Sequence, residues 1–278
     1  MQNAIDLAMK GRYTTSPNPN VGCVIVEGNK ILSRSYHAKS GKDHAEVIAL
    51  KKLKKKVNNQ MVMYLNLEPC CHTGKTGPCT KTIIESGIKN VEIAMFDPNP
   101  VVKGNGVKEL RKNGITVNVG LCKNEAIEIN NDFITRHNKN RPYVVLKQAI
   151  SADFRITNPQ NRWISSKLSR EDSHFHRAES CAILVGSNTV RNDNPRLNVR
   201  LTKKKLLISE SIRQPIKIIL DSKLSLNINK YKIFDGKTKK IVFNSVETKF
   251  DKKKNIDFIK INREKIGLNL ISIMKILT

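Results

Sequence analysis

Two short motifs, HAEVIAL (44–50) and EPCCHTGKTGPC (68–79), stand close together in the sequence. They place a histidine, a glutamate two residues later and three thiols, Cys70, Cys71 and Cys79, in one short part of a 278-residue chain. Six cysteines are too few for a disulfide scaffold in a chain of this length. Thiols clustered beside histidines therefore indicate a metal site.

The order of these residues resembles the zinc-deaminase signature, H-x-E followed by P-C-x-x-C, in which the glutamate shuttles protons. HAE and PC match it, although eight residues, CHTGKTGP, separate Cys70 from Cys79. A catalytic zinc takes three protein ligands and lowers the pKa of a water in the fourth position to about 7. We predict that His44, Cys70 and Cys79 bind one Zn²⁺ per chain, and that Glu46 carries the proton.

A structural zinc site is the alternative. It would need four protein ligands, and Cys71 or His72 would then complete the set. Neighbouring cysteines rarely bind one ion together, because their side chains diverge. The ordered run of His-x-Glu, Pro-Cys and Gly-Pro-Cys favours the catalytic site.

The bulk composition predicts a globular protein of two domains. With 278 residues, of which 39% are hydrophobic, the chain can bury a real core. The first residues include an acidic side chain, and no uncharged apolar run approaches the ~20 residues that cross a bilayer. We therefore expect a soluble, cytoplasmic protein that does not bind a membrane.

The chain is strongly basic, with a formal net charge of +26 and a pI near 10.0. This balance is typical of nucleic-acid binders. The lysines are scattered among asparagines and isoleucines, as AT-rich codons would produce, and aromatics at 5% leave little for bases to stack on. We predict no specific nucleic-acid partner, and note that basic side chains also attract phosphorylated small molecules.

Helical and strand patterns alternate along the chain and predict a mixed α/β fold. In the first half we expect a hairpin within 21–36, strands at 61–67, 91–96 and 115–120, and helices at 3–11, from about 44, at 79–87, before 114 and around 123–138. HNKNRP (137–142) indicates a linker, and we place a domain boundary near 141. Beyond it we expect strands at 143–150, 181–186, 215–220 and 239–244, and a final helix.

The motifs are similar to those of the bifunctional riboflavin-biosynthesis deaminase-reductases, the RibD family, in which the eight-residue gap is typical. The resemblance rests on TTSPNPNVGCVIV (14–26), HAEVIAL, LEPCCHTGKTGPC (67–79), FDPNPVVKGNG (96–106), VVLKQAISAD (144–153), WISS (163–166), HFHRAES (174–180), AILVGSNTVRNDNPRLNVR (182–200) and IILDS (218–222). It implies a cytidine-deaminase-like three-layer domain over 1–141, and a dihydrofolate-reductase-like α/β domain over 142–278 that uses NADPH. It also implies a homo-oligomer.

For the first domain, the resemblance implies that Glu46 and the zinc ligands remove the 2-amino group of a phosphorylated pyrimidine. The substrate would be 2,5-diamino-6-(5-phosphoribosylamino)pyrimidin-4(3H)-one, and ammonia would be released. Asn20 would bind the ring, whereas Lys75 and Asn99 would meet the ribose phosphate.

For the second domain, the resemblance implies two sets of contacts. NADPH would meet Trp163, Thr189, Asp193 and Ser222, and the phosphorylated substrate would meet Asn161, Arg177, Leu197 and Arg200. The family's SLDG is SADF here, with Phe154 in place of the glycine, and two residues are missing before the tryptophan. The family's later glutamate and glycine-rich segment does not occur before Thr278. We therefore expect an incomplete reductase domain that reduces its substrate poorly.

Two other classes of function stay open. A transfer-RNA deaminase would share HAE and suit the positive charge, but is expected to have a short Cys-x-x-Cys and no second domain. A non-catalytic, zinc-stabilised binding module would show four protein ligands.

Overall fold

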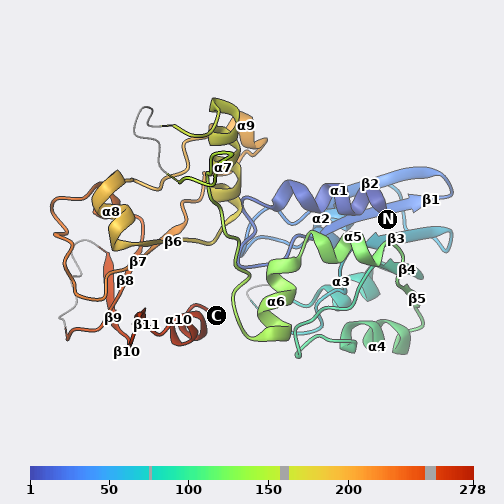
Figure 1. The fold of residues 1–278 in the computed structure, drawn as a ribbon. Helices are drawn as coiled ribbons and strands as arrows, with labels where there is room; N and C mark the ends of the chain where they lie inside the picture. The colour runs from blue at the N-terminus through green and yellow to red at the C-terminus, as the bar shows by residue number, and fades with distance from the viewer. Residues whose placement is uncertain (75–76, 157–162, 248–254) are drawn as a thin grey trace. The chain divides into compact units, whose positions relative to one another are not determined.

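The computed structural model describes residues 1–74, 77–156, 163–247 and 255–278. The chain divides into two compact units, Met1–Tyr143 and Val144–Thr278 (Figure 1). Among the described residues, no helix combines the length and the apolar character needed to cross a membrane. The predicted mixed α/β architecture is confirmed in each unit.

Unit 1 is built on a five-stranded sheet with the order β2-β1-β3-β4-β5. β1 runs antiparallel to β2 and β3, whereas β3, β4 and β5 run parallel. The predicted hairpin is confirmed, and Gly28 takes the positive φ of 54° that its turn requires. The strands are β1 (Gly22–Glu27), β2 (Lys30–Tyr36), β3 (Met61–Leu65), β4 (Asn90–Ile93) and β5 (Thr116–Val119).

The helices of unit 1 contribute to two separate apolar clusters. One joins α2, α3 and α4 to the strands, where Met61, Met63 and Leu65 alternate with less buried residues of β3. The other joins α1, α5 and α6. This gives the predicted three-layer arrangement. The helices are α1 (Gln2–Ala8), η1 (Met9–Gly11), α2 (Ala45–Lys52), α3 (Cys79–Ser86), α4 (Asn105–Lys112), α5 (Lys123–Glu128) and α6 (Asn131–Lys139).

The single helix expected around 123–138 is two helices, α5 and α6. The break lies at Asn130, which is fully buried. Its side chain accepts from the backbone N–H of Asn20 at 2.8 Å and donates to the carbonyl of Asn20 at 3.1 Å. Asparagine competes with the helix backbone for hydrogen bonds, and here it ties the helix break to the loop before β1.

Unit 2 contains a four-stranded parallel sheet with the order β6-β7-β8-β9. Its strands are β6 (Ala182–Gly186), β7 (Ile216–Leu220), β8 (Lys240–Asn244) and β9 (Ile256–Lys260), and a short ribbon pairs β10 (Arg263–Glu264) with β11 (Gly267–Leu268). The helices are α7 (Lys167–Glu179), α8 (Ser187–Asp193), α9 (Lys203–Leu206), η2 (Lys232–Phe234) and α10 (Leu270–Ile276).

The prediction of a strand at 143–150 is wrong. The segment forms no strand, and its side chains are exposed, at 58% for Val144, 63% for Val145 and 82% for Leu146. A strand needs a neighbour for its backbone groups, and within the described chain none of the strands pairs with this segment. β9 was not expected, because its sequence follows a lysine run that masks the apolar pattern.

Gly22 provides a stability test, because α1 lies against the start of β1. A Cβ atom at Gly22 would lie 2.0 Å from the carbonyl oxygen of Ala4 and 2.9 Å from the amide nitrogen of Ala8. Because both contacts are backbone, we expect Gly22→Ala to lower the free energy of unfolding of unit 1 by about 3 kcal/mol in urea denaturation.

Gly186→Ala is the matched control, because a Cβ there meets no atom within 4 Å. It should change the stability of unit 2 by less than about 1 kcal/mol. Equal losses for the two variants would contradict the packing described for Gly22.

Candidate metal centre and active site

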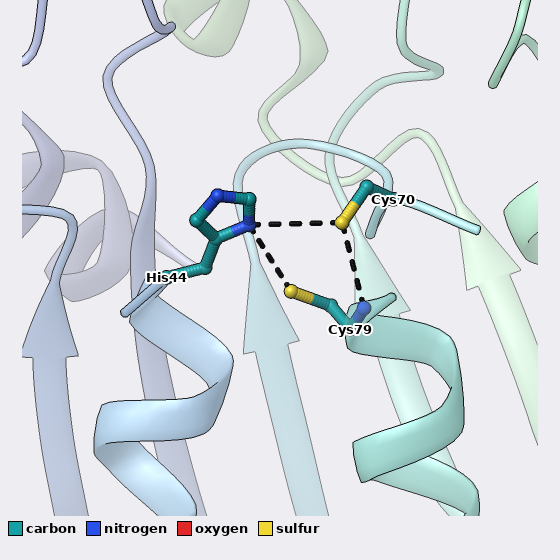
Figure 2. A group of neighbouring side chains, drawn as sticks. All are labelled: His44, Cys70 and Cys79. Carbon is teal, nitrogen blue, oxygen red and sulfur yellow. Dashed lines mark hydrogen bonds between the residues drawn. The ribbon is translucent and has the colours of Figure 1, made fainter. Parts of the chain in front are cut away.

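The three predicted zinc ligands converge at the starts of two helices (Figure 2). His44 is the N-cap of α2, Cys79 is the first residue of α3, and Cys70 lies in the loop after β3. Nδ1 of His44 is 3.2 Å from Sγ of Cys79 and 3.6 Å from Sγ of Cys70. All three donor atoms lie within 4.8 Å of one another.

This donor set fits a zinc ion. At the usual Zn–N and Zn–S distances, a tetrahedral ion separates its nitrogen and sulfur ligands by about 3.6 Å. The backbone N–H of Cys79 also points at Sγ of Cys70, at 3.4 Å. The hydrogen bond from the Cys79 thiol, assisted by His44, lowers the pKa of Cys70 well below its ordinary value and favours the thiolate, the form that binds metal.

Glu46 stands beside the donor set but is not one of the converging ligands. It lies in the first turn of α2 and is 3% exposed. Its Oε2 is buried and makes no hydrogen bond within the described part of the chain. Burial raises the pKa of this carboxyl above its ordinary value. A buried carboxylate oxygen without a hydrogen-bond partner among the described residues, next to one nitrogen and two sulfur donors, is expected where a metal and its water complete the site.

A cavity of about 330 Å³ opens beside these residues. Its wall includes two polar residues that the sequence analysis missed, Asn18 and His37. His37 is 2% exposed, and burial lowers its pKa, so the ring is neutral. Nδ1 lies 3.1 Å from the carbonyl of Asp43 and therefore carries the hydrogen, which leaves Nε2 to accept from Nδ2 of Asn18 at 3.1 Å.

Glu68 is another residue of the cavity wall. It is 3% exposed, and its carboxylate accepts three backbone N–H bonds, from Asp97 at 3.0 Å, Gly104 at 2.9 Å and Val107 at 3.0 Å. These bonds tie the loop 97–104 and the start of α4 to the segment that carries Cys70. The contact is close, because a Cβ at Gly106 would lie 2.3 Å from the carbonyl of Pro69.

Asp97 is a further cavity residue that was missed. Burial raises its pKa to about 7, and the neighbouring carboxylate of Glu68 adds to the shift. Asp97 and Asn18 lie in the quoted motifs DPNP and SPNPN, so the signal was present. Polar residues between prolines are more often turn formers than ligands, and the sequence gives no way to separate the two.

The residues predicted to bind the substrate in unit 1 lie in different settings. Asn99 lies on the cavity wall. The side-chain amide of Asn20 accepts from Oγ1 of Thr15 at 3.0 Å and donates to the carbonyl of Ile129 at 3.0 Å. Asn18, and not Asn20, is among the described residues that line the cavity. Lys75 lies outside the described residues. The binding roles of all three stay predictions.

Three of the four residues predicted to bind the cofactor in unit 2 follow two neighbouring strands of the sheet. Thr189 and Asp193 are exposed on α8, directly after β6, and Ser222 follows β7. Because β6 and β7 are parallel neighbours, these residues share the carboxyl edge where α/β sheets bind ligands. Trp163 is 49% exposed, and the guanidinium of Arg170 lies 4.4 Å from its ring centroid.

The residues predicted to bind substrate in unit 2 are partly brought together. Arg177, on α7, has its pKa lowered by burial and then by the charge of Arg200, so the two guanidinium groups are close. Leu197 takes a positive φ of 55° and packs against the apolar cluster beneath α8. Asn161 lies outside the described residues.

Comparison with protein families covers both units. Residues 1–95 match the cytidine and deoxycytidylate deaminase zinc-binding region, and residues 142–278 match the RibD C-terminal domain. The first match contains all three converging ligands and Glu46.

Several curated relatives are riboflavin biosynthesis proteins named RibD. The riboflavin biosynthesis protein RibD of Aquifex aeolicus is 45% identical over 231 residues, which are 82% of this chain and 63% of the relative. That of Bacillus amyloliquefaciens is 36% identical over 100% of this chain and 73% of the relative. The chain spans under two thirds of the length of several such relatives, including those of Aquifex aeolicus and Escherichia coli, at 63% and 62%.

Two solved structures superpose on nearly the whole chain. Acinetobacter baumannii RibD aligns with a TM-score of 0.88 at 34% identity, covering 99% of this chain and 75% of that one. The diaminohydroxyphosphoribosylaminopyrimidine deaminase/5-amino-6-(5-phosphoribosylamino)uracil reductase of Thermotoga maritima aligns with a TM-score of 0.85 at 37% identity, covering 100% and 76%. The fold, the metal-binding residues and these likenesses together show that the chain belongs to the RibD family.

Proposed function

We propose that unit 1 is a zinc-dependent deaminase that acts on 2,5-diamino-6-(5-phosphoribosylamino)pyrimidin-4(3H)-one. One observation carries this proposal: Oε2 of Glu46 is buried, makes no hydrogen bond to the described residues, and stands beside three converging zinc donors at the wall of a cavity. The name of the Thermotoga maritima relative, with which the chain aligns over its full length, supports this class of substrate.

In the proposed reaction, water adds to the ring carbon that bears the 2-amino group, the C–N bond breaks and ammonia leaves. A bound zinc supplies Lewis acidity that makes water a nucleophile at neutral pH. Glu46 takes one proton from the water and gives it to the ring nitrogen. It then takes the proton of the newly added hydroxyl group and gives it to the amino group, which leaves as ammonia while the C=O bond forms. Burial raises the pKa of Glu46, which suits a group that must both take and give a proton.

The cavity wall is suited to a polar ring. Asn18, the neutral His37, Asp97 and Asn99 place hydrogen-bonding groups along it. Its volume of about 330 Å³ is at the lower end of small-molecule sites. A folded nucleic acid would have to extrude its base to reach such a cavity, so a free nucleotide is the favoured substrate.

We also propose that unit 2 takes part in the NADPH-dependent reduction of the deaminated product, in which the ribosyl group becomes ribityl. The match of residues 142–278 to the RibD C-terminal domain supports this activity. In this proposal the chain works in the cytoplasm as a homo-oligomer on a small phosphorylated substrate, with no specific nucleic-acid or membrane partner.

The first test replaces the proton carrier. Glu46→Gln keeps the shape of the side chain but cannot take up a proton, so deamination should fall by ~10²-fold or more while about one zinc per chain remains. Ammonia release and metal content are the measurements. Cys79→Ser is the contrasting variant, and it should lose zinc and activity together, because a hydroxyl replaces thiolate poorly. Loss of zinc from the Glu46 variant would contradict its role.

The second test loosens the cavity wall through Glu68. In Glu68→Gln, the amide nitrogen faces at least one backbone N–H, whichever way the side chain turns, because both carboxylate oxygens now accept. The loop with Asp97 and Asn99 should shift, so KM should rise roughly tenfold while zinc content stays the same.

The matched control is Glu92→Gln. Oε1 of Glu92 accepts a hydrogen bond from Nδ2 of Asn118 at 2.7 Å, and an amide oxygen can replace it. Its KM should equal that of the parent chain. An unchanged KM in the Glu68 variant would contradict the proposal that this carboxylate positions the loop.

The third test separates the two activities. The zinc donors and Glu46 all belong to unit 1, so ammonia should be released at the same rate with and without NADPH. Oxidation of NADPH, followed by its absorbance, should require prior deamination if unit 2 acts on the product. A deamination rate that depends on NADPH, or a preference for transfer RNA over the free nucleotide, would contradict the proposed function.

A further inference from the structure

Three asparagines from distant parts of the sequence meet in unit 1. Asn20 lies in the loop before β1, Asn66 directly follows β3, and Asn130 lies at the break between α5 and α6. Asn66 and Asn130 are both 0% exposed. These three residues are named here the asparagine hub.

The hub holds both backbone polar groups of Asn20. The backbone N–H donates to Oδ1 of Asn130 at 2.8 Å. The backbone carbonyl accepts from Nδ2 of Asn130 at 3.1 Å and from Nδ2 of Asn66 at 2.9 Å. Asn66 is fixed in turn, because its Oδ1 accepts from the backbone N–H of Gly22 at 2.8 Å. Two buried side chains therefore clamp one residue of the loop.

The side chain of Asn20 is also engaged within the protein. Its Oδ1 accepts from Oγ1 of Thr15 at 3.0 Å, and its Nδ2 donates to the carbonyl of Ile129, the residue before Asn130, at 3.0 Å. Thr15 is 2% exposed. The amide oxygen and nitrogen of Asn20 thus both face protein groups, and its position serves to anchor the loop.

Asn130 joins the loop in place of capping its own helix. It is the N-cap of α6, where an asparagine side chain commonly accepts from an N–H of the first helical turn. Here the side chain makes no such bond to the described residues of α6 and reaches Asn20 instead. The start of α6 and the loop before β1 are therefore held together directly.

Each member of the hub lies beside residues of the cavity wall. Asn18 and Pro19 precede Asn20, Leu67 follows Asn66, and α6, which begins after Asn130, carries two more lining residues. The lining residues on α6 are Phe133 and Arg136. A wall built from separate segments keeps its geometry only when those segments are fixed to one another. The hub fixes three of them.

We propose that the asparagine hub positions the substrate-binding wall of unit 1, and that Asn20 acts through Asn18 instead of touching the pyrimidine ring. The inference rests on the proposed deaminase function. Nδ2 of Asn18 lies 3.1 Å from Nε2 of His37, and its Oδ1 accepts from Oγ of Ser40 at 3.3 Å. These two bonds orient the amide of Asn18, while the hub fixes the backbone that carries it.

The first test is Asn130→Asp. The new side chain has the same shape and keeps an oxygen for the backbone N–H of Asn20, but it places a second oxygen, and no donor, against the carbonyl of Asn20. The loop should shift, so KM for the diaminopyrimidine nucleotide should rise on the order of tenfold. Zinc content should stay the same and kcat should change less than about twofold, because α2 and α3 hold His44, Glu46 and Cys79.

The matched control is Asn90→Asp. Nδ2 of Asn90 donates to the carbonyl of Asn59 at 3.0 Å, so this variant loses the same kind of bond. Asn90 begins β4 and is not among the described residues that line the cavity. Its KM should equal that of the parent chain.

A milder variant tests the hub if Asn130→Asp fails to fold. Thr15→Val keeps the shape of the side chain, introduces no charge and leaves Oδ1 of Asn20 without this donor. Its KM should rise severalfold, with zinc content unchanged. An unchanged KM in every folded hub variant, or a loss confined to kcat, would overturn the proposal.

A double-mutant cycle separates positioning from a general loss of structure. Asn18→Ala removes the side chain that the hub is proposed to position. In this background the hub variant should raise KM much less than in the parent chain, because the two residues act as one unit. Equal increases in the two backgrounds would overturn a role through Asn18.

Hydrogen exchange supplies a readout that does not need activity. The bond to Asn130 protects the backbone N–H of Asn20, so exchange in the peptide 14–22 should be about tenfold faster in the hub variant, and that of α2 should be unchanged. Unchanged exchange in the peptide 14–22 would overturn the hub. A parent chain that releases no ammonia, with faster exchange in the variant, would contradict the proposed deaminase and leave the hub in place.

Discussion

The geometry of unit 1 depends on two helices that begin at the same edge of one sheet. His44 caps α2 and Cys79 opens α3, so the backbone that starts each helix also places a metal-binding atom. Helix N-termini favour negative charge, and the first N–H of α3 points at the sulfur of Cys70, which stabilises its thiolate form. Cys70 reaches the same point from the loop after β3, and Glu68, two residues earlier, locks that loop to the start of α4.

The sequence was sufficient to predict this centre, because each ligand sits beside a strong local signal. His-x-Glu precedes an apolar helical stripe, and Pro78 and Gly87 bracket α3. The cavity walls were harder to predict. Glu68 acts through backbone N–H groups far along the chain, and His37 is neutral because of burial, which no short motif encodes. Asn20 and Asn18 are two residues apart, and only the fold shows which of them faces the cavity.

Unit 2 was predicted less completely, because its local patterns are weaker. The apolar run at 143–150 has strand composition, yet strand formation depends on a partner and not on composition alone. Lys217 and Lys240 are buried at 1% and 0% exposure, side by side on β7 and β8, although lysine normally predicts surface. Their ammonium groups donate to the carbonyls of Ile233 and Gly236. The ring nitrogens of His174 likewise face two N–H groups of Arg200, which lies 26 residues further along the chain.

We propose that unit 1 deaminates a phosphorylated diaminopyrimidine by means of zinc. The most direct measurement is ammonia release from this substrate by the full chain, first after removal of metal by a chelator and then during stepwise addition of Zn²⁺. Three protein donors and one ion per chain predict that activity is lost with the metal and returns in full at about one equivalent. Ammonia release that continues at the original rate in the metal-free chain would contradict zinc-dependent deamination.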